Sequence, residues 1–164
     1  ANAQAGVASD RPVALHIVGD DRWADIVDGL RDAQSLTDAV DARVVGFVDD
    51  LDAFLSTMDI AMLPVVVGGT GISSKIFKCI ETGTPFVSTL EGNRGFACGP
   101  ECRETFFVRD VHELFGRAMR ILGSQAAYDA ACDLLVGIGE SLSQRNLATN
   151  ALLIEQLRRA SAPA

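Results

Sequence analysis

A glycine-rich turn followed by a lysine carries the clearest chemical signal in this chain. It reads Gly69-Thr70-Gly71-Ile72-Ser73-Ser74-Lys75, follows an apolar run and opens a helical pattern. Glycines let the backbone approach a ligand closely, while N–H groups and the dipole at a helix start favour negative charge. Lys75 adds a full positive charge one turn into the helix. The pattern predicts a phosphate-binding turn; the alternative is an ordinary strand-to-helix connection with Lys75 as a solvated lysine.

Alternating strand and helix patterns surround this turn and must position it. Short apolar runs predict strands at Val13–Val18, Arg43–Val48, Ile60–Pro64, Pro85–Thr89 and Thr105–Val108. Strands that alternate with helical patterns indicate βαβ units, so we expect an α/β fold, a doubly wound, Rossmann-like parallel sheet with helices on both faces. Ligands bind such sheets at the carboxyl ends of the strands, where the glycine turn follows the third strand.

Helical spacing of apolar residues predicts the remaining elements. The patterns cover residues 23–30, 51–58, 72–80, 111–122, 125–138 and 141–159. Aspartates that suit helix N-caps precede two of these patterns, at Asp49 and Asp50 and at Asp110. Gly83, followed by Pro85, marks a helix exit. The glycine-containing stretch between the fourth and fifth strands is expected to be a loop.

Composition limits the classes of function. The 164 residues are 48% hydrophobic and 22% charged, with a formal net charge of -8. This balance argues against a general nucleic-acid or anionic-membrane binder, because those classes use broad basic surfaces. No apolar run approaches the ~20 residues of a membrane helix and no signal peptide is evident, so we expect a cytoplasmic protein. Residues 1–12 are expected to be a disordered lead, a tag or a linker, and residues 13–160 one domain.

Cysteines and histidines could bind a metal, but their placement argues against it. Cys98 and Cys102 have the spacing of half a metal site, and no second pair of ligands accompanies them. His16 falls in a strand pattern and His112 at a helix start, so structural roles are expected for both. We therefore expect no metal, and we expect reduced thiols rather than disulfides.

An ordered series of short motifs resembles a known protein family. The motifs are Leu15–Gly19, Val45–Leu51, Met58–Pro64, Gly69–Lys75 and Glu81–Thr89. Together they resemble the C-terminal, donor-binding half of the retaining GT-B glycosyltransferases called family 4 or group 1, over about residues 13–157. The resemblance implies one half of a GT-B fold that binds a nucleotide-diphosphate sugar, with the acceptor-binding N-terminal half absent from this chain.

The resemblance also assigns residues to parts of the donor. The diphosphate is expected at the glycine turn and helix start, Gly69, Thr70, Gly71, Ile72, Ser73 and Lys75. No metal is implied, because the helix end supplies the positive charge. The nucleotide base is expected beside the loop after the second strand, Gly46, Phe47 and Val48. The sugar is expected near the turn after the fourth strand, Gly92, Asn93 and Gly95, for which a plain turn is the alternative reading.

One helix position departs from the family pattern. The helix after the glycine turn usually carries Lys-x-x-Glu, whose glutamate holds the donor ribose. Lys75 matches the lysine of that pattern, whereas Lys78 occupies the position of the glutamate. Lysine cannot accept hydrogen bonds from a ribose diol. Glu81, almost one turn further along, could reach the ribose or could be a solvated carboxylate, so Lys78 and Glu81 are both candidate nucleotide contacts.

The resemblance implies a glycosyltransferase of the hexosyltransferase type that moves a sugar from a nucleotide-diphosphate donor to an unidentified acceptor with retention. Its expected partners are the nucleotide sugar and its own N-terminal domain, not nucleic acid, and peripheral membrane association of the full-length protein is allowed. The isolated half is expected to be inactive, with no catalytic residue identified. A non-catalytic GT-B interaction domain and a nucleotide-sugar epimerase of the same architecture are alternatives. A phosphoacceptor receiver is disfavoured, because the third predicted strand ends in Pro64 rather than in an aspartate.

Overall fold

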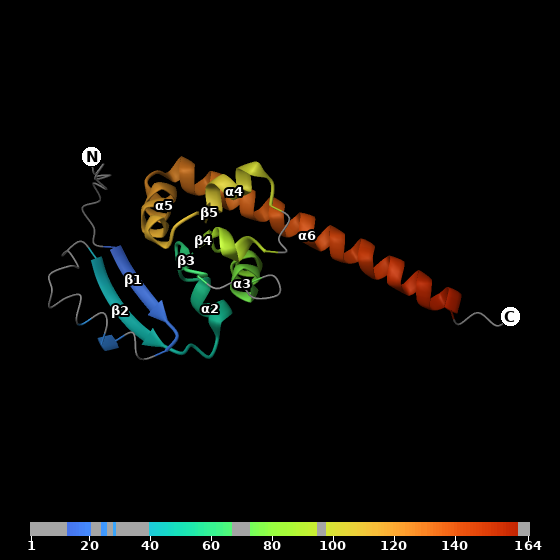
Figure 1. Cartoon of the computed structure of the whole chain (residues 1–164), viewed down its shortest axis with the longest axis horizontal. Coiled ribbons are helices and arrows are strands. Elements are labelled where there is room, and N and C mark those ends of the chain that lie inside the picture. The colour runs from blue at the N-terminus through green and yellow to red at the C-terminus, as the bar shows by residue number, and fades with distance from the viewer. Residues whose placement is uncertain are drawn as a thin grey trace. The chain divides into compact units, whose positions relative to one another are not determined.

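The strands form two parallel sheets, one in each of the two units into which the chain divides (Figure 1). The structure is a computed structural model, and it describes residues 13–20, 24–25, 28, 40–66, 73–94 and 98–160. The first unit covers residues 1–54 and the second covers residues 55–164. All described strand pairs are parallel, which confirms the predicted α/β class.

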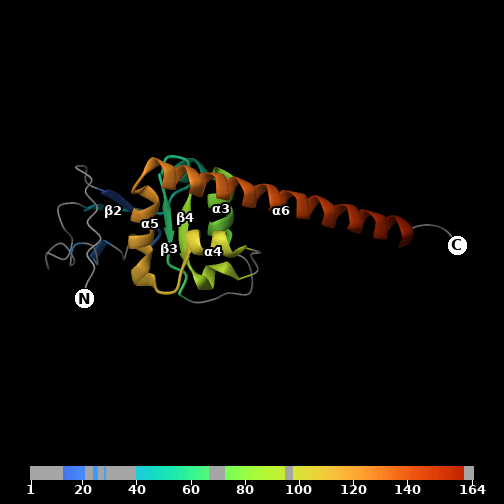
Figure 2. The same ribbon diagram turned by 90° about the horizontal axis from the view of Figure 1, so that it is seen from above.

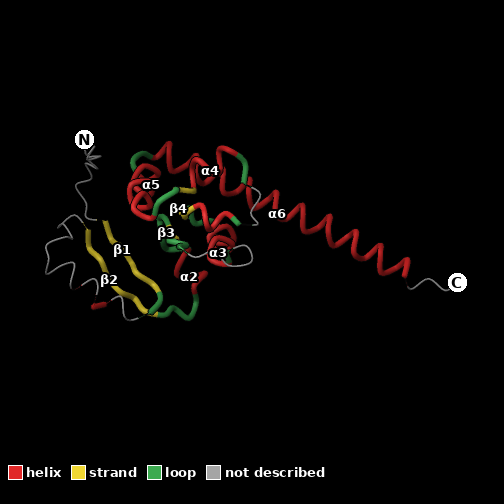
Figure 3. The backbone as a smooth tube through the Cα atoms, viewed as in Figure 1, coloured by secondary structure: helices red, strands yellow, loops and turns green. Residues whose placement is uncertain are grey.

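In the first unit, β1 (Val13–Val18) pairs with β2 (Val40–Gly46), and the two strands run side by side in Figure 3. The register is regular from Val13 opposite Val40 up to Ile17, after which a bulge places Val18 opposite Gly46. Gly46 has a φ of 75°, a left-handed conformation that glycine adopts without strain. The predicted strand Arg43–Val48 was therefore wrong at both bounds, because pairing begins earlier and Gly46 ends it.

The second unit contains a sheet in the order β3-β4-β5. Its strands are β3 (Ala61–Leu63), β4 (Phe86–Thr89) and β5 (Phe107–Val108). Helices α3 (Ser74–Thr82) and α4 (Pro100–Phe106) lie on one side of these strands and α5 (Leu114–Leu122) lies on the other (Figure 2). The buried ring of Phe86 stacks on Phe106 at 4.9 Å between centroids, which joins β4 to α4 in the core.

Three predicted helix boundaries are confirmed by their hydrogen bonds. The carboxylate of Asp50 accepts a bond from the Ala53 N–H at 2.9 Å, at the start of α2 (Leu51–Leu55). Asp110 accepts the His112 N–H at 2.9 Å and begins the short 3-10 helix η2 (Val111–Glu113) that leads into α5. At the end of α3, Gly83 has a φ of 71° and the adjacent N–H groups bond back to the last turn, which is a Schellman ending.

Two predictions about the later chain were wrong. The expected loop after β4 contains the 3-10 helix η1 (Leu90–Asn93) and most of α4. Helix α4 continues into the predicted strand, so Thr105 and Phe106 are helical and the strand shortens to Phe107–Val108. Gly99 is the N-cap of α4 and Pro100 fits its first turn, where a proline loses no helical hydrogen bond. The two expected final helices form one, α6 (Gln125–Ala160), whose second half extends beyond the strands in Figures 1 and 2.

The expectation that every cysteine is a free thiol was also wrong. Cys98 and Cys102 form a disulfide, with their Cα atoms 5.6 Å apart, a separation that suits this bond. The first turn of α4, which the sequence did not predict, brings these two residues together. Cys79 and Cys132 are free thiols, as expected.

Candidate functional site

The start of α3 is the described part of the predicted phosphate site. Ser73 is the N-cap residue, and its carbonyl oxygen accepts bonds from the N–H groups of Ile76 at 3.0 Å and Phe77 at 3.2 Å. The Ser73 side chain makes no capping hydrogen bond, so the first N–H groups of the helix need another partner. Lys75 is exposed in this first turn. The other residues of the predicted turn, Gly69, Thr70, Gly71 and Ile72, lie outside the described residues.

Two hydroxyl groups of β4 hold the segment that leads into the glycine turn. Ser88 Oγ donates to the carbonyl oxygen of Leu63 at 3.0 Å, and Thr89 Oγ1 donates to that of Val65 at 2.5 Å. Ser88 is fully buried and Thr89 is 5% exposed. The Val65 N–H also bonds to the Leu63 oxygen at 2.9 Å, so the chain turns tightly at the end of β3.

Sequence reasoning missed Ser88 and Thr89 as positioning residues. The available signal was the occurrence of hydroxyl side chains inside an otherwise apolar strand. A buried hydroxyl needs a hydrogen-bond partner, and here the carbonyl groups after β3 supply it. The two side chains thereby fix the backbone at the carboxyl edge of the β3-β4-β5 sheet, where ligands of parallel sheets bind.

Lys78 and Glu81 interact with each other on α3. The Lys78 Nζ and the Glu81 Oε2 atoms are 3.1 Å apart, and the side chains are 41% and 59% exposed. Such an exposed pair at i,i+3 spacing contributes only about 0.2–0.5 kcal/mol. Glu81 thus lies beside the helix position where the family pattern has its ribose-binding glutamate, but its carboxylate faces a lysine in this structure.

The turn after β4 places Gly92 and Asn93 at the same carboxyl edge of the sheet. Gly92 is buried, and a Cβ atom built on it would lie 2.4 Å from Ser88 Oγ, so close packing explains why this residue is glycine. Asn93 Oδ1 is buried and has no hydrogen-bond partner within the described part of the chain. Gly95, the third residue predicted near the sugar, lies outside the described ranges.

The loop predicted to meet the nucleotide base belongs to the first unit. Gly46 accepts the Gly19 N–H at 2.8 Å, which ties the ends of β1 and β2 together. Phe47 is 84% exposed directly after this tie, whereas Val48 is half-buried. An exposed aromatic ring of this kind offers a flat face on which a planar base can stack.

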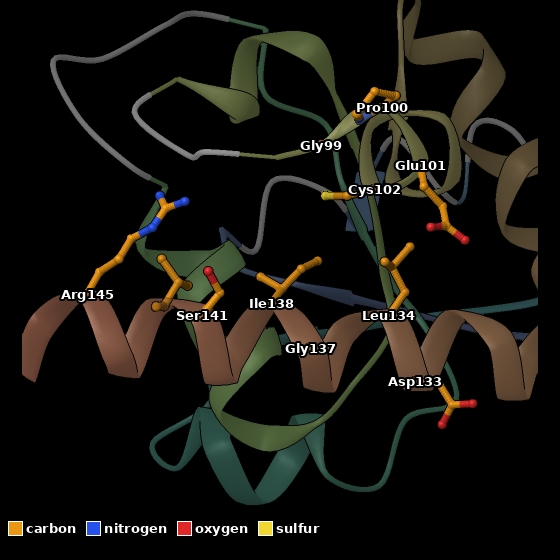
Figure 4. A pocket seen from close by; sticks show the side chains of 11 residues that line it. Gly99, Pro100, Glu101, Cys102, Asp133, Leu134, Gly137, Ile138, Ser141 and Arg145 are labelled. Carbon is orange, nitrogen blue, oxygen red and sulfur yellow. The ribbon is translucent and has the colours of Figure 1, made fainter.

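A hollow of about 400 Å³ lies apart from these residues, between the start of α4 and α6 (Figure 4). Its walls include Pro100, Cys102, Ile138 and Arg145. None of the described residues that are predicted to contact the donor lines this hollow.

Neither a cluster of metal-binding side chains nor a membrane-spanning helix occurs in the described part of the chain. No three His, Cys, Asp or Glu side chains gather there in a way that could hold a metal ion. His16 packs its ring 5.9 Å from that of Phe54, in line with a structural role. Among the described helices, none combines the length and the apolar character needed to cross a bilayer.

Comparison with known proteins identifies the family. A family model for "Glycosyl transferases group 1" matches residues 2–124, which is more than half of the chain. The match includes both sheets and ends just after α5, so α6 lies beyond it. No curated protein and no solved structure matches the chain. The family match confirms the resemblance derived from the motifs, and the chain belongs to the group 1 glycosyltransferases as a domain of the GT-B type.

Proposed function

We propose that this chain binds the nucleotide-diphosphate sugar of a retaining glycosyltransferase, and that an acceptor-binding domain completes the reaction cleft. The observation that carries the proposal is the start of α3. Its N-cap side chain leaves the first turn uncapped, Lys75 is exposed in that turn, and the helix follows the carboxyl end of a parallel strand. A helix start at this edge of a parallel sheet favours an anionic ligand.

In this proposal the helix start stabilises the leaving group. Negative charge grows on the donor diphosphate as its bond to the sugar breaks, and N–H groups fixed in place beforehand stabilise that charge without a cost of reorientation. Ser88 and Thr89 contribute by holding the backbone before the turn. Lys75 adds electrostatic attraction, so no metal ion is required in this scheme.

Two further observations bear on the donor, each within its own unit. In the first unit, the exposed ring of Phe47 suits stacking on a planar nucleotide base. In the second unit, the buried Asn93 Oδ1 has no partner among the described residues and can accept a hydrogen bond from a sugar hydroxyl. Such a bond would remove the cost of about 1–3 kcal/mol that an unsatisfied buried acceptor carries.

Calorimetry with UDP-, GDP- and ADP-sugars tests the proposal directly. The variant Lys75→Gln removes one charge-assisted hydrogen bond to phosphate, worth about 1.5–3 kcal/mol, so donor affinity should fall by roughly 10- to 150-fold. Arg120→Gln is the matched control, because it removes the same charge from an exposed site on α5, on the other side of the sheet. Equal affinity of the Lys75→Gln variant and the native chain would refute the placement of the diphosphate.

A second candidate function is a non-catalytic domain that binds a protein partner, and the Lys78–Glu81 pair favours it. If ribose binding requires a glutamate at position 78, this chain lacks it, and the nearby Glu81 carboxylate is paired with Lys78. The variant Lys78→Glu should then create donor binding in a chain that lacks it. If the native chain already binds a donor, the catalytic proposal is favoured and the same variant should strengthen ribose recognition.

A further inference from the structure

The disulfide at the start of α4 is a chemical group that the proposed donor site does not use. Cys102 is only 3% exposed, whereas Cys98, just before the helix, is partly exposed. Of the two cysteines, Cys98 is therefore the more exposed residue and the candidate for attack. We propose that Cys98 and Cys102 form a reversible thiol–disulfide exchange site, that a small external thiol attacks Cys98, and that the redox state controls the order of the start of α4.

The hollow beside α4 provides space for this exchange. Gly99, Pro100, Glu101 and Cys102 form its wall on the α4 side, and α6 forms the opposite wall. Figure 4 shows the Cys102 side chain on the wall of this hollow. Once the bond breaks, the freed Cys102 sulfur can move away into about 400 Å³ of space instead of remaining in contact with Cys98.

The exchange is balanced in atoms and electrons. An external thiolate attacks Cys98 Sγ, forms a mixed disulfide and expels the Cys102 thiolate, which takes up a proton. A second external thiolate then attacks the external sulfur of that mixed disulfide and releases Cys98 as a thiolate, which is also protonated. Two external thiols are thereby oxidised to one disulfide while the protein disulfide is reduced by two electrons. The reverse reaction uses a small disulfide such as oxidised glutathione as the oxidant.

The redox state acts on α4 because of where the two sulfurs are attached. Phe106 anchors the end of α4 by its 4.9 Å stack on Phe86. At the other end, the bond from the Arg103 N–H to the Gly99 oxygen, 3.0 Å long, belongs to the first turn. The disulfide links Cys98 across that turn, so its loss removes the covalent restraint at the exposed end while the core anchor remains.

Differential alkylation with mass spectrometry tests the exchange in the native chain. The Cys98–Cys102 disulfide should form with oxidised glutathione, open with excess reduced glutathione and form again when the ratio is reversed. Two freely alkylated thiols under every ratio, or a disulfide that no excess of reduced glutathione opens, would overturn the proposal.

Two variants test which sulfur is attacked. Both variants carry Cys132→Ser to remove the second free thiol. The Cys79 thiol is not expected to react, because it is buried and its pKa is raised to about 12. With Cys102→Ser added, the remaining Cys98 should form a mixed disulfide at least ~10 times faster than Cys102 does with Cys98→Ser added, since thiol reactivity requires access. Equal rates, or a faster Cys102, would contradict the assignment of Cys98.

Hydrogen exchange tests the control of α4. The Arg103 amide should exchange faster in the reduced protein, while amides of α5 should not change. Unchanged exchange at Arg103 would refute the effect on α4.

Discussion

Replacing Gly92 by alanine tests the packing at the carboxyl edge of the second sheet. The added Cβ would lie 2.4 Å from Ser88 Oγ and 3.2 Å from Ile76 Cδ1, and both neighbours are fully buried. Relief of the shorter contact requires the Ser88 hydroxyl to move, which breaks its 3.0 Å bond to the Leu63 carbonyl group. The loss of stability in this variant is therefore expected to come from the steric contact with Ser88 and not from a change in helix propensity.

Two costs set the magnitude. Overpacking of a core costs about 1–3 kcal/mol, and the buried Ser88 hydroxyl that loses its bond to Leu63 costs a similar ~1–3 kcal/mol. If Ser88 moves, the steric overlap is partly relieved but the hydrogen bond is lost, so the two costs do not add in full. We therefore expect Gly92→Ala to lower the free energy of unfolding by about 2–4 kcal/mol. At roughly 3 °C for each kcal/mol, the melting temperature should fall by about 6–12 °C.

Urea unfolding followed by far-UV circular dichroism measures the change. Gly116→Ala is the matched control, because it adds the same methyl group to α5 where nothing lies within 4 Å, and it should stabilise the protein by about 0.5–1 kcal/mol. The double variant Gly92→Ala/Ser88→Ala removes the clashing oxygen, so it should be at least about 1 kcal/mol more stable than the sum of the single changes predicts. A neutral Gly92→Ala variant, or strictly additive changes, would refute the reasoning.

Three further predictions concern single residues of the second unit. Thr84→Val removes a 2.9 Å bond from a buried hydroxyl to the Leu55 oxygen, so urea unfolding should show a loss of about 1–3 kcal/mol; a loss below 0.5 kcal/mol would be inconsistent with this bond. Burial raises the pKa of Cys79 from 9.0 to about 12, so the folded state holds the proton more tightly and stability is lost as pH rises above 9.0, by up to about 1.4 kcal/mol per pH unit. The native chain should therefore lose more stability between pH 9 and pH 11 than Cys79→Ala does, and parallel curves would exclude this contribution. Asp110→Ala removes the cap on the His112 N–H and should cost about 1 kcal/mol, measured by thermal unfolding against the conservative variant Asp110→Asn, which should retain most of the stability.

The elements that could be predicted from sequence are those whose geometry depends on nearby residues. Asp50 and Asp110 bond to N–H groups two or three positions away, and Gly83 ends α3 through bonds within one turn. The parallel α/β class followed from the alternation of apolar runs and helical patterns, because that alternation requires crossovers. The family was evident from the order of several motifs, and the match over residues 2–124 confirms it.

Other features were missed because their signals were weak or contradictory. Helix α4 lies in a stretch rich in glycine and proline, yet Gly99 serves as its N-cap and Pro100 fits its first turn. Helix α6 continues through Gly137 and Gly139, because interior glycines cost about 1 kcal/mol each and that cost is small beside the packing of a long helix. The first turn of α4 brings Cys98 and Cys102 together, so the disulfide was missed because α4 was not predicted.

The sequence by itself determined the class of fold, the family and the positions of the helix caps, since these depend on composition, order and short-range hydrogen bonds. Only the tertiary structure decided that Ser88 and Thr89 hold the backbone of Leu63 and Val65, residues 25 and 24 positions away. The same is true of the close approach of position 92 to Ile76 on α3, where an added Cβ would lie 3.2 Å from the Ile76 side chain. Contacts across a sheet depend on how strands align and which side chains face each other, and no short stretch of sequence contains that information.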